Sequence, residues 1–231
     1  MSIDAKLGEF EKIIKCKFKN RDLLKQALVH RSYINEHKSF ALDHNERLEF
    51  LGDAVLELVV TDHLYLNYEL PEGELTNLRA AVVRGEMLWR VAEELNLSDY
   101  LLLSRGEQRG GDKARQYILA NAFEAVVGAI YLDRGYKTVE KFINKYIVSK
   151  FPEVIENGLH IDSKSKFQEV AQEKLRVTPS YRVLAEEGLD HAKEFVVGVF
   201  LDKRKMGEGS GSSKQEAQQK AAEEALKKIE D

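Results

Sequence analysis

The sequence has little cysteine, no long apolar run and no excess of positive charge. Its single cysteine, Cys16, excludes an internal disulfide and is typical of a reducing compartment, so a cytoplasmic protein is expected. The longest apolar stretches, such as 125–132, are too short to cross a bilayer. The first 18 residues also lack the apolar segment of a signal peptide. We therefore expect no membrane partner.

The charge balance by itself argues against a nucleic-acid partner. The formal net charge is −4, and residues 161–231 contain 13 Lys and Arg against 14 Asp and Glu. Binding depends, however, on where the cations lie rather than on their sum. Any nucleic-acid function must therefore be argued from local patterns of residues.

Residues 1–157 are expected to form an all-α domain. Apolar residues recur at helical spacing in several segments, and no alternating strand pattern precedes Pro152. The predicted helices cover residues 22–30, 46–68, 76–95, 118–132 and 138–151. Thr76 is a candidate N-cap for the third of these helices.

Residues 158–231 have a different pattern and are expected to form a second, smaller domain. A predicted helix over 163–175 is followed by two strand-like segments, 181–186 and 194–201. Alternate glycines at 207, 209 and 211 are interpreted as a loop, and an Ala-rich helix over 213–229 closes the chain. This order of elements predicts a small α+β domain.

Three acidic residues in the first domain share one face of a predicted helix. Glu46, Glu49 and Asp53 are spaced at i, i+3 and i+7, which places them on one side at about 100° per residue. Like charges at this spacing destabilise a helix unless a cation compensates them. Carboxylate oxygens suit Mg²⁺ or Mn²⁺, so the pattern favours a divalent metal site. The alternative is an ordinary solvated helix face.

A second predicted helix carries polar residues in apolar surroundings. Asn121 and Glu124 are also spaced at i and i+3, within a segment that is otherwise apolar and rich in small residues. Such a helix can pack closely against another one. If it faced Glu49 and Asp53, the two helices would form a four-ligand oxygen site.

These segments resemble the ribonuclease III family. The stretch 45–56, NERLEFLGDAVL, is similar to the signature of that family, and residues 118–133 resemble its second catalytic segment. Shorter matches lie at HRSY (30–33), EGELT (72–76), LRA (78–80) and GDK (111–113). The resemblance implies an endoribonuclease that hydrolyses double-stranded RNA with a divalent metal. It further implies 5′-phosphate and 3′-hydroxyl ends and a part in rRNA and mRNA processing.

The resemblance also assigns roles to individual residues. The implied metal ligands are Glu49, Asp53, Asn121 and Glu124, and the implied catalytic residues are Asp53, Glu124, Glu46 and Glu72. The expected cofactor is Mg²⁺, with Mn²⁺ as a substitute, and no small-molecule cofactor is expected.

Position 121 departs from the family, which usually has Asp there. The Asn121 side-chain oxygen can still coordinate a hard cation, but the site loses one negative charge. We expect weaker metal affinity rather than loss of the site. The alternative is a dimeric RNA-binding protein whose catalytic centre is weakened or inactive.

The resemblance implies a homodimer, in which each subunit cuts one strand of the duplex. The residues around the acidic face give independent support, because Phe50, Leu51, Val55 and Leu58 extend the apolar surface beyond one core stripe. The alternative is that these four side chains fill the core of a monomer.

Residues 163–229 resemble a double-stranded-RNA-binding domain, which implies α-β-β-β-α topology. The implied RNA contacts are Lys166, Gln168, Glu169, His191, Lys193, Ser213 and Lys214. Ser213 and Lys214 open a predicted helix, whose N-terminal N–H groups can bind phosphates. Gln215 stands where the family commonly has Lys, and Leu189 where Pro is frequent, so modest affinity is expected. A small α+β domain for other interactions is the alternative.

Overall fold

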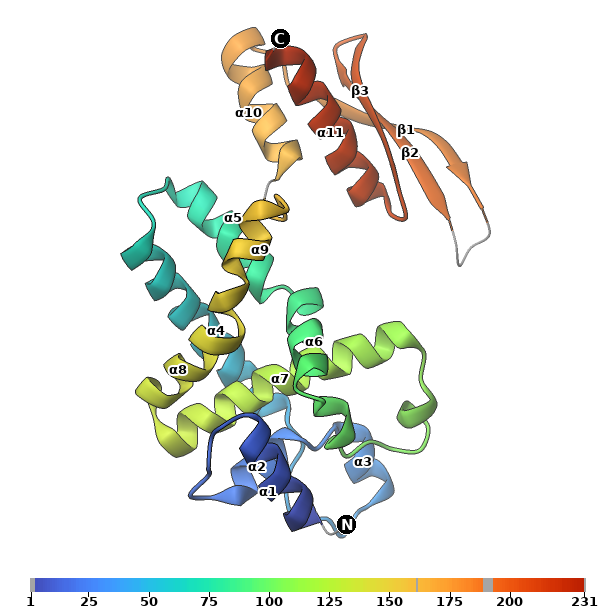
Figure 1. The fold of residues 1–231 in the computed structure, drawn as a ribbon. Coiled ribbons are helices and arrows are strands. Elements are labelled where there is room, and N and C mark those ends of the chain that lie inside the picture. The colour runs from blue at the N-terminus through green and yellow to red at the C-terminus, as the bar shows by residue number, and fades with distance from the viewer. Residues whose placement is uncertain (1–2, 161, 189–192, 231) are drawn as a thin grey trace. The chain divides into compact units, whose positions relative to one another are not determined.

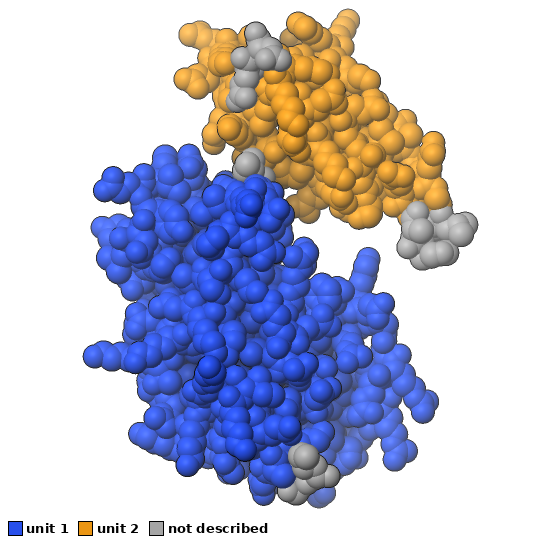
Figure 2. Space-filling model, in the orientation of Figure 1, with its two compact units in different colours: residues 1–160 blue, residues 161–231 orange. Residues whose placement is uncertain are grey.

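The chain folds into two compact units with separate hydrophobic cores, residues 1–160 and 161–231 (Figure 2). The computed structural model describes residues 3–160, 162–188 and 193–230. Within those ranges, no helix combines the length and the apolar character that a membrane span requires.

Unit 1 is built of helices, as the periodicity predicts (Figure 1). Its α-helices are α1 (Ile3–Ile13), α2 (Arg21–Ala27), α3 (Arg31–Glu36), α4 (Glu46–Asn67), α5 (Glu72–Val83), α6 (Gly85–Glu94), α7 (Asp112–Arg134), α8 (Tyr136–Tyr146) and α9 (Phe151–Glu156). Three short 3₁₀ helices are η1 (Leu97–Asp99), η2 (Glu107–Arg109) and η3 (Val148–Lys150). In the described part of this unit, β-pairing is limited to one isolated parallel bridge between Val29 and Leu102. The expected all-α domain is thus confirmed.

Helices α4 and α7 form the centre of unit 1, where α7 crosses the other helices (Figure 1). Between Ile118 and Ile130, every side chain except those of Asn121 and Glu124 is buried. A helix that is apolar on all sides must be surrounded by other elements. Asn121 and Glu124 therefore lie where the neighbours of this segment of α7 leave it partly open.

The predicted helix over 76–95 is wrong in its bounds. The structure has two helices, α5 and α6, separated by Arg84 in an extended conformation (φ −63°, ψ 147°). Helix α5 begins four residues before Thr76, directly after Pro71, with Glu72 and Glu74 in its first turn. Acidic residues there interact favourably with the helix dipole. Thr76 is not a cap, because its hydroxyl donates to Glu72 Oε1 at 3.0 Å.

Unit 2 has the expected α-β-β-β-α topology. Its elements are α10 (Ser163–Leu175), β1 (Ser180–Glu187), β2 (Glu194–Leu201), β3 (Arg204–Gly211) and α11 (Lys214–Glu230). The strands form an antiparallel sheet in the order β1-β2-β3, and both helices pack on one face of it. Phe167, Val199, Ala221 and Ala225 are fully buried in the core between them.

The alternate glycines at 207, 209 and 211 do not form a loop, because they lie in strand β3. A Cβ atom on Gly207 would lie 2.3 Å from the Ala221 carbonyl oxygen, and one on Gly209 would lie 2.4 Å from the Ala221 nitrogen. Glycine in a strand often marks such a close approach of another backbone. The glycines therefore allow α11 to pack against β3, and the loop prediction was wrong.

Candidate active site and RNA-binding surface

Two glycines bring the backbones of α4 and α7 into contact where the helices cross. A Cβ atom on Gly52 would lie 1.8 Å from the Glu124 carbonyl oxygen, and one on Gly128 would lie 2.3 Å from the Leu48 carbonyl oxygen. No side chain fits at either position without movement of a backbone. The crossing therefore sets Asp53, next to Gly52, beside Glu124.

The predicted four-residue cluster forms around this crossing. The Asn121 side chain interacts with the Glu49 carboxylate and lowers its pKa, which couples α7 to α4 one turn before Asp53. Burial raises the pKa of Glu49, and the negative charges of Glu46 and Asp53 add to this effect. Burial, with the charges of Asp53 and Glu49, raises the pKa of Glu124 to about 8. The structure thus brings together Glu49, Asp53, Asn121 and Glu124.

The donor atoms of this cluster are hard oxygens from three carboxylates and one amide. Among the residues that the structure describes, no three His, Cys, Asp or Glu side chains are gathered tightly enough to hold a metal ion. The four side chains thus share a site without closing into a coordination shell. Burial first, and then the charges of Asp53 and Glu49, disfavour the ionised form of Glu124 at this site.

Glu46 lies beside the cluster but its carboxylate faces basic side chains. Oε1 lies 3.3 Å from an Arg31 guanidinium nitrogen, and Oε2 lies 3.8 Å from His44 Nδ1. The preceding residue, Asn45, is buried and its amide donates to the Ala27 carbonyl oxygen at 3.2 Å. This bond fixes the start of α4 against the end of α2.

Glu72 lies away from the other predicted site residues. It is the first residue of α5, its side chain is exposed, and it accepts a hydrogen bond from Thr76. No contact recorded among the described residues joins it to the cluster between α4 and α7. The structure therefore does not bring this predicted catalytic residue to the others.

A cavity of about 230 Å³ adjoins the cluster on the side of Glu46. It is lined by His30, Arg31, Asn45, Glu46, Glu49, Tyr117, Ile118 and Asn121. Sequence reasoning did not select Arg31 or Tyr117 as site residues, although Arg31 is part of the HRSY match. Arg31 forms no pattern with the acids because it lies on another helix, whereas the i, i+4 spacing of Tyr117 and Asn121 could have indicated Tyr117.

The apolar residues near the acids are only partly at the surface. Phe50 is 81% exposed and Leu58 is 56% exposed, whereas Leu51 is half-buried and Val55 is buried. Further along the same helix, Tyr65 is 77% exposed. Helical geometry places Phe50, Leu58 and Tyr65 on one side of α4. Two of the four residues expected at a subunit contact thus belong to the core.

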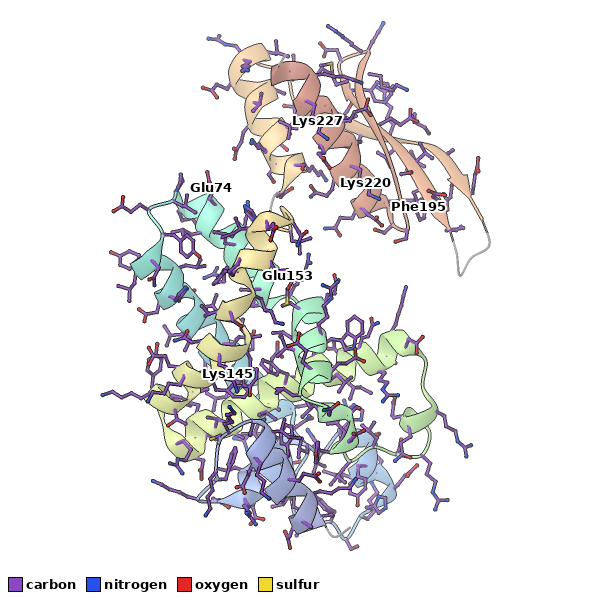
Figure 3. All side chains as sticks on the ribbon, viewed as in Figure 1. Glu74, Lys145, Glu153, Phe195, Lys220 and Lys227 are labelled. Carbon is purple, nitrogen blue, oxygen red and sulfur yellow. The ribbon has the colours of Figure 1, made fainter. Side chains whose placement is uncertain are left out.

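The predicted RNA-binding residues of α10 and α11 are at the surface of unit 2. Lys166, Gln168 and Glu169 are exposed, while Phe167 between them is buried. The Ser213 hydroxyl accepts a hydrogen bond from the Glu216 N–H at 3.2 Å and so caps α11. The Lys214 ammonium lies 5.4 Å from the centre of the Phe195 ring, which belongs to β2 (Figure 3).

A groove of about 550 Å³ joins the two helices. It is lined by Asp162, Lys164, Ser165, Gln168, Lys214, Gln215, Gln218 and Gln219. Sequence reasoning missed Lys164, whose ammonium donates to Gln218 Oε1 at 2.9 Å. Only the packing of α10 on α11 reveals that these two residues share a surface with Gln168 and Lys214.

The remaining predicted contacts lie in or next to the segment between β1 and β2. Lys193 is half-buried and its ammonium lies 2.9 Å from Glu186 Oε1. His191 and Leu189 lie outside the described residues. The structure therefore does not place His191 relative to the other expected contacts.

Comparison with known proteins identifies both units. A family model described as ribonuclease-III-like matches residues 20–151, and one described as a double-stranded RNA binding motif matches residues 163–229. The chain is 46% identical over 215 residues to Ribonuclease 3 of Oceanobacillus iheyensis, covering 92% of this chain and 93% of the relative. It is 45% identical to Ribonuclease 3 of Enterococcus faecalis, covering 92% of each chain.

A solved structure resembles unit 1. The nuclease domain of ribonuclease III from Campylobacter jejuni superposes with a TM-score of 0.56 at 39% sequence identity. The match covers 62% of this chain and 96% of that domain. Fold, family models and curated relatives agree, and the chain belongs to the ribonuclease III family of endoribonucleases, with a nuclease domain followed by a double-stranded-RNA-binding domain.

Proposed function

We propose that the chain hydrolyses phosphodiester bonds of double-stranded RNA in a divalent-metal-dependent reaction that leaves 5′-phosphate and 3′-hydroxyl ends. The observation that carries this proposal is the convergence of Glu49 and Asp53 from α4 with Asn121 and Glu124 from α7. The membership of the chain in an endoribonuclease family supports the same reaction.

The residues present fit a hard divalent cation. Their donors are carboxylate and amide oxygens, which Mg²⁺ and Mn²⁺ prefer. A cation would favour the ionised form of Glu124, whose pKa is raised to about 8 by burial and by the charges of Asp53 and Glu49. When bound, Mg²⁺ would lower the pKa of a coordinated water and neutralise charge developing on the phosphate. Glu49, Asp53, Asn121 and Glu124 would hold it.

The protein side chains have distinct proposed parts in the reaction. Asp53 and Glu124 orient the reacting groups. They lie at the crossing of α4 and α7, so their placement depends on the contact between the backbones of these two helices. Glu49 and Asn121 interact at the edge of the cluster, and this interaction positions both side chains. Glu46 and Glu72 are proposed to act near the cleavage site from outside this group.

Incubation of the full chain with a generic RNA duplex, with and without Mg²⁺, tests the proposal. We expect fragments only with Mg²⁺, and we expect their 5′ ends to accept a labelled phosphate only after phosphatase treatment. Single-stranded RNA of the same sequence should remain intact. Cleavage that persists in a chelator, or products with 5′-hydroxyl ends, would contradict the proposed chemistry.

The variant Asn121→Asp is expected to bind the metal more tightly. A fourth carboxylate adds one negative charge next to the bound metal ion. At a partly buried site such a charge strengthens metal binding by roughly 1–2 kcal/mol. The Mg²⁺ concentration that gives half-maximal cleavage should therefore fall about tenfold. Titration of cleavage against Mg²⁺ and Mn²⁺ for both proteins measures this. No cleavage by the Asn form at any concentration would instead favour the inactive alternative.

We propose that unit 2 binds the RNA duplex through exposed residues of α10 and the N-terminus of α11. Lys214 lies on the groove shared with Gln168, where an ammonium and free helix N–H groups can meet a phosphate. The proposed contacts also include Lys166, Glu169, His191, Lys193 and Ser213. Recognition of this kind depends on A-form shape more than on sequence.

The variant Lys214→Ala is expected to bind duplex RNA about tenfold more weakly, because one charge-assisted phosphate contact is lost. The slope of log affinity against log salt should fall by about one. Lys227→Ala is the matched control, since Lys227 lies on the same helix nearer its C-terminus and pairs with Glu223 (Figure 3). Parental affinity in the Lys214 variant would favour a domain that binds something other than RNA.

We propose that the active form is a homodimer that pairs through the exposed side of α4. Phe50, Leu58 and Tyr65 form an apolar row there, and exposed rows of this kind mark protein contacts. A solved structure of the Campylobacter jejuni nuclease domain is also described as flexible in a region involved in dimer formation. Sedimentation equilibrium should give twice the chain mass of 26.4 kDa. A concentration-independent mass of one chain would contradict the dimer.

The RNAs proposed as substrates are duplex regions of rRNA and mRNA precursors, cut in the cytoplasm. Support comes from the double-stranded RNA binding motif and from Cys16, a buried free thiol that suits a reducing compartment.

A further inference from the structure

The position of Glu46 differs from that of the other acids on α4. Both of its oxygens face basic groups, Arg31 on one side and His44 on the other, at 3.3 and 3.8 Å. Glu49 and Asp53 interact electrostatically with Glu124 across the helix crossing, whereas the charge of Glu46 acts on Glu49. Glu46 is therefore the acid of this helix face that has basic neighbours, although its charge still reaches the cluster through Glu49.

Arg31 is presented to solvent at the rim of the cavity next to the cluster. Its side chain is 66% exposed, and the Glu46 side chain is 46% exposed. An ion pair this exposed stabilises a fold by only about 0–1 kcal/mol. Its main physical effect is thus to limit where the guanidinium can lie, rather than to hold α3 against α4.

The backbone around Arg31 is held in place by several hydrogen bonds. The preceding N–H, that of His30, donates to the Leu102 carbonyl oxygen at 3.1 Å. The Ser32 hydroxyl accepts a hydrogen bond from the Ser104 N–H at 3.1 Å, and the Ser32 N–H donates to His30 Nδ1 at 3.3 Å. Arg31 is therefore the first residue of a helix whose start is fixed to the 102–104 segment.

An RNA strand that enters this site meets repulsion from the acidic cluster. Each phosphate carries a negative charge, and metal ions at the cluster can offset that repulsion only for the phosphate being cut. A neighbouring phosphate needs a different partner. A guanidinium suits it, because its planar donors match phosphate oxygens in a two-point contact. Arg31 is the guanidinium among the residues that line this cavity.

We propose that Arg31 binds a phosphate of the RNA strand adjacent to the scissile one, and that Glu46 is a positioning residue that acts through Arg31 and not a metal ligand. This inference rests on the proposed nuclease function. It gives a role in RNA binding to the residues beside the same site. The cavity between Glu46 and Asn121 then accommodates the strand where it leaves the metal-binding residues.

A double-mutant cycle tests the proposal with the full chain and a defined RNA duplex. The variants are Glu46→Gln, Arg31→Ala and the combination of both. Arg31→Ala should raise the KM for RNA about tenfold with little change in kcat, because a binding contact is lost. Glu46→Gln should raise KM less. The double variant should match Arg31→Ala alone, since Glu46 has no effect once the guanidinium is gone.

Two further measurements distinguish this role from metal binding and from a general loss of structure. The half-saturating Mg²⁺ concentration should rise much less in Glu46→Gln than in Glu49→Gln, because Glu46 acts on the cluster only through its charge. In a chelator, Arg31→Ala should lower the slope of log RNA affinity against log salt by about one. Arg90→Ala is the matched control, because it removes another guanidinium of unit 1 that pairs with a glutamate, Glu86, at 2.6 Å. This control should behave as the parent.

The outcomes separate the inference from the function on which it rests. Failure of the unmodified chain to cut duplex RNA with Mg²⁺ would overturn the nuclease proposal itself. If the parent cuts, a rise in the Mg²⁺ requirement of Glu46→Gln as large as that of Glu49→Gln would instead make Glu46 a metal ligand. Additive effects of the two single variants, or an unchanged salt slope in Arg31→Ala, would also overturn the inference.

Discussion

Replacing Asp53 with Asn, or Glu124 with Gln, is expected to reduce the cleavage rate of duplex RNA about 10³-fold or more. Both carboxylates lie at the crossing of α4 and α7, and the charge of Asp53 contributes to the raised pKa of Glu124. Each amide keeps the size of the side chain but removes one negative charge. The loss should therefore fall on catalysis, which single-turnover cleavage at saturating RNA measures.

Binding of RNA should survive both changes, because the proposed contacts of unit 2 are not altered. Affinity measured in a chelator should be no weaker than that of the parent, since removing a negative charge from the cluster can only reduce its repulsion of phosphates. Asp62→Asn is the matched control, as it removes an exposed carboxylate from the same helix. Cleavage within a few-fold of the parent in either site variant would show that the catalytic centre lies elsewhere.

The location of the acids was largely predictable from the sequence. Spacing at i, i+3 and i+7 places Glu46, Glu49 and Asp53 on one side of a helix, and the structure keeps all three near the start of α4. Asn121 and Glu124 stood out because every residue around them is apolar. Two polar residues among apolar ones predict a partly exposed position, and both side chains are half-buried in a segment of α7 that is otherwise buried.

The contacts between helices were not predictable from periodicity. The spacing of residues along one helix does not indicate which side chains of another helix they contact. The pairing of Glu46 with Arg31 was therefore missed. The glycines at 207 and 209 were misread for the same reason, because a close approach and a turn both require glycine. In each case a neighbour distant in sequence determines the role of the residue.

Gly52→Ala and Gly128→Ala are expected to destabilise unit 1 more than any surface change. A Cβ atom at either position would overlap a backbone carbonyl oxygen of the other helix, at 1.8 Å for Gly52 and 2.3 Å for Gly128. Backbone atoms cannot rotate away as a side chain can, so the helices must separate. Such overpacking costs about 3 kcal/mol or more, which corresponds to a melting temperature lower by roughly 10 °C. Thermal unfolding followed by circular dichroism measures the shift.

The same substitutions should reduce cleavage in protein that remains folded. Separation of α4 from α7 moves Asp53 away from Glu124, and a displacement of about 1 Å can cost roughly 10²-fold in rate. Gly73→Ala is the matched control, because nothing lies within 4 Å of a Cβ atom at that helical position. It should leave cleavage unchanged and stabilise the protein slightly, since Ala favours a helix over Gly. If Gly52→Ala melted and cleaved like this control, backbone contact between α4 and α7 could not be what positions the acids.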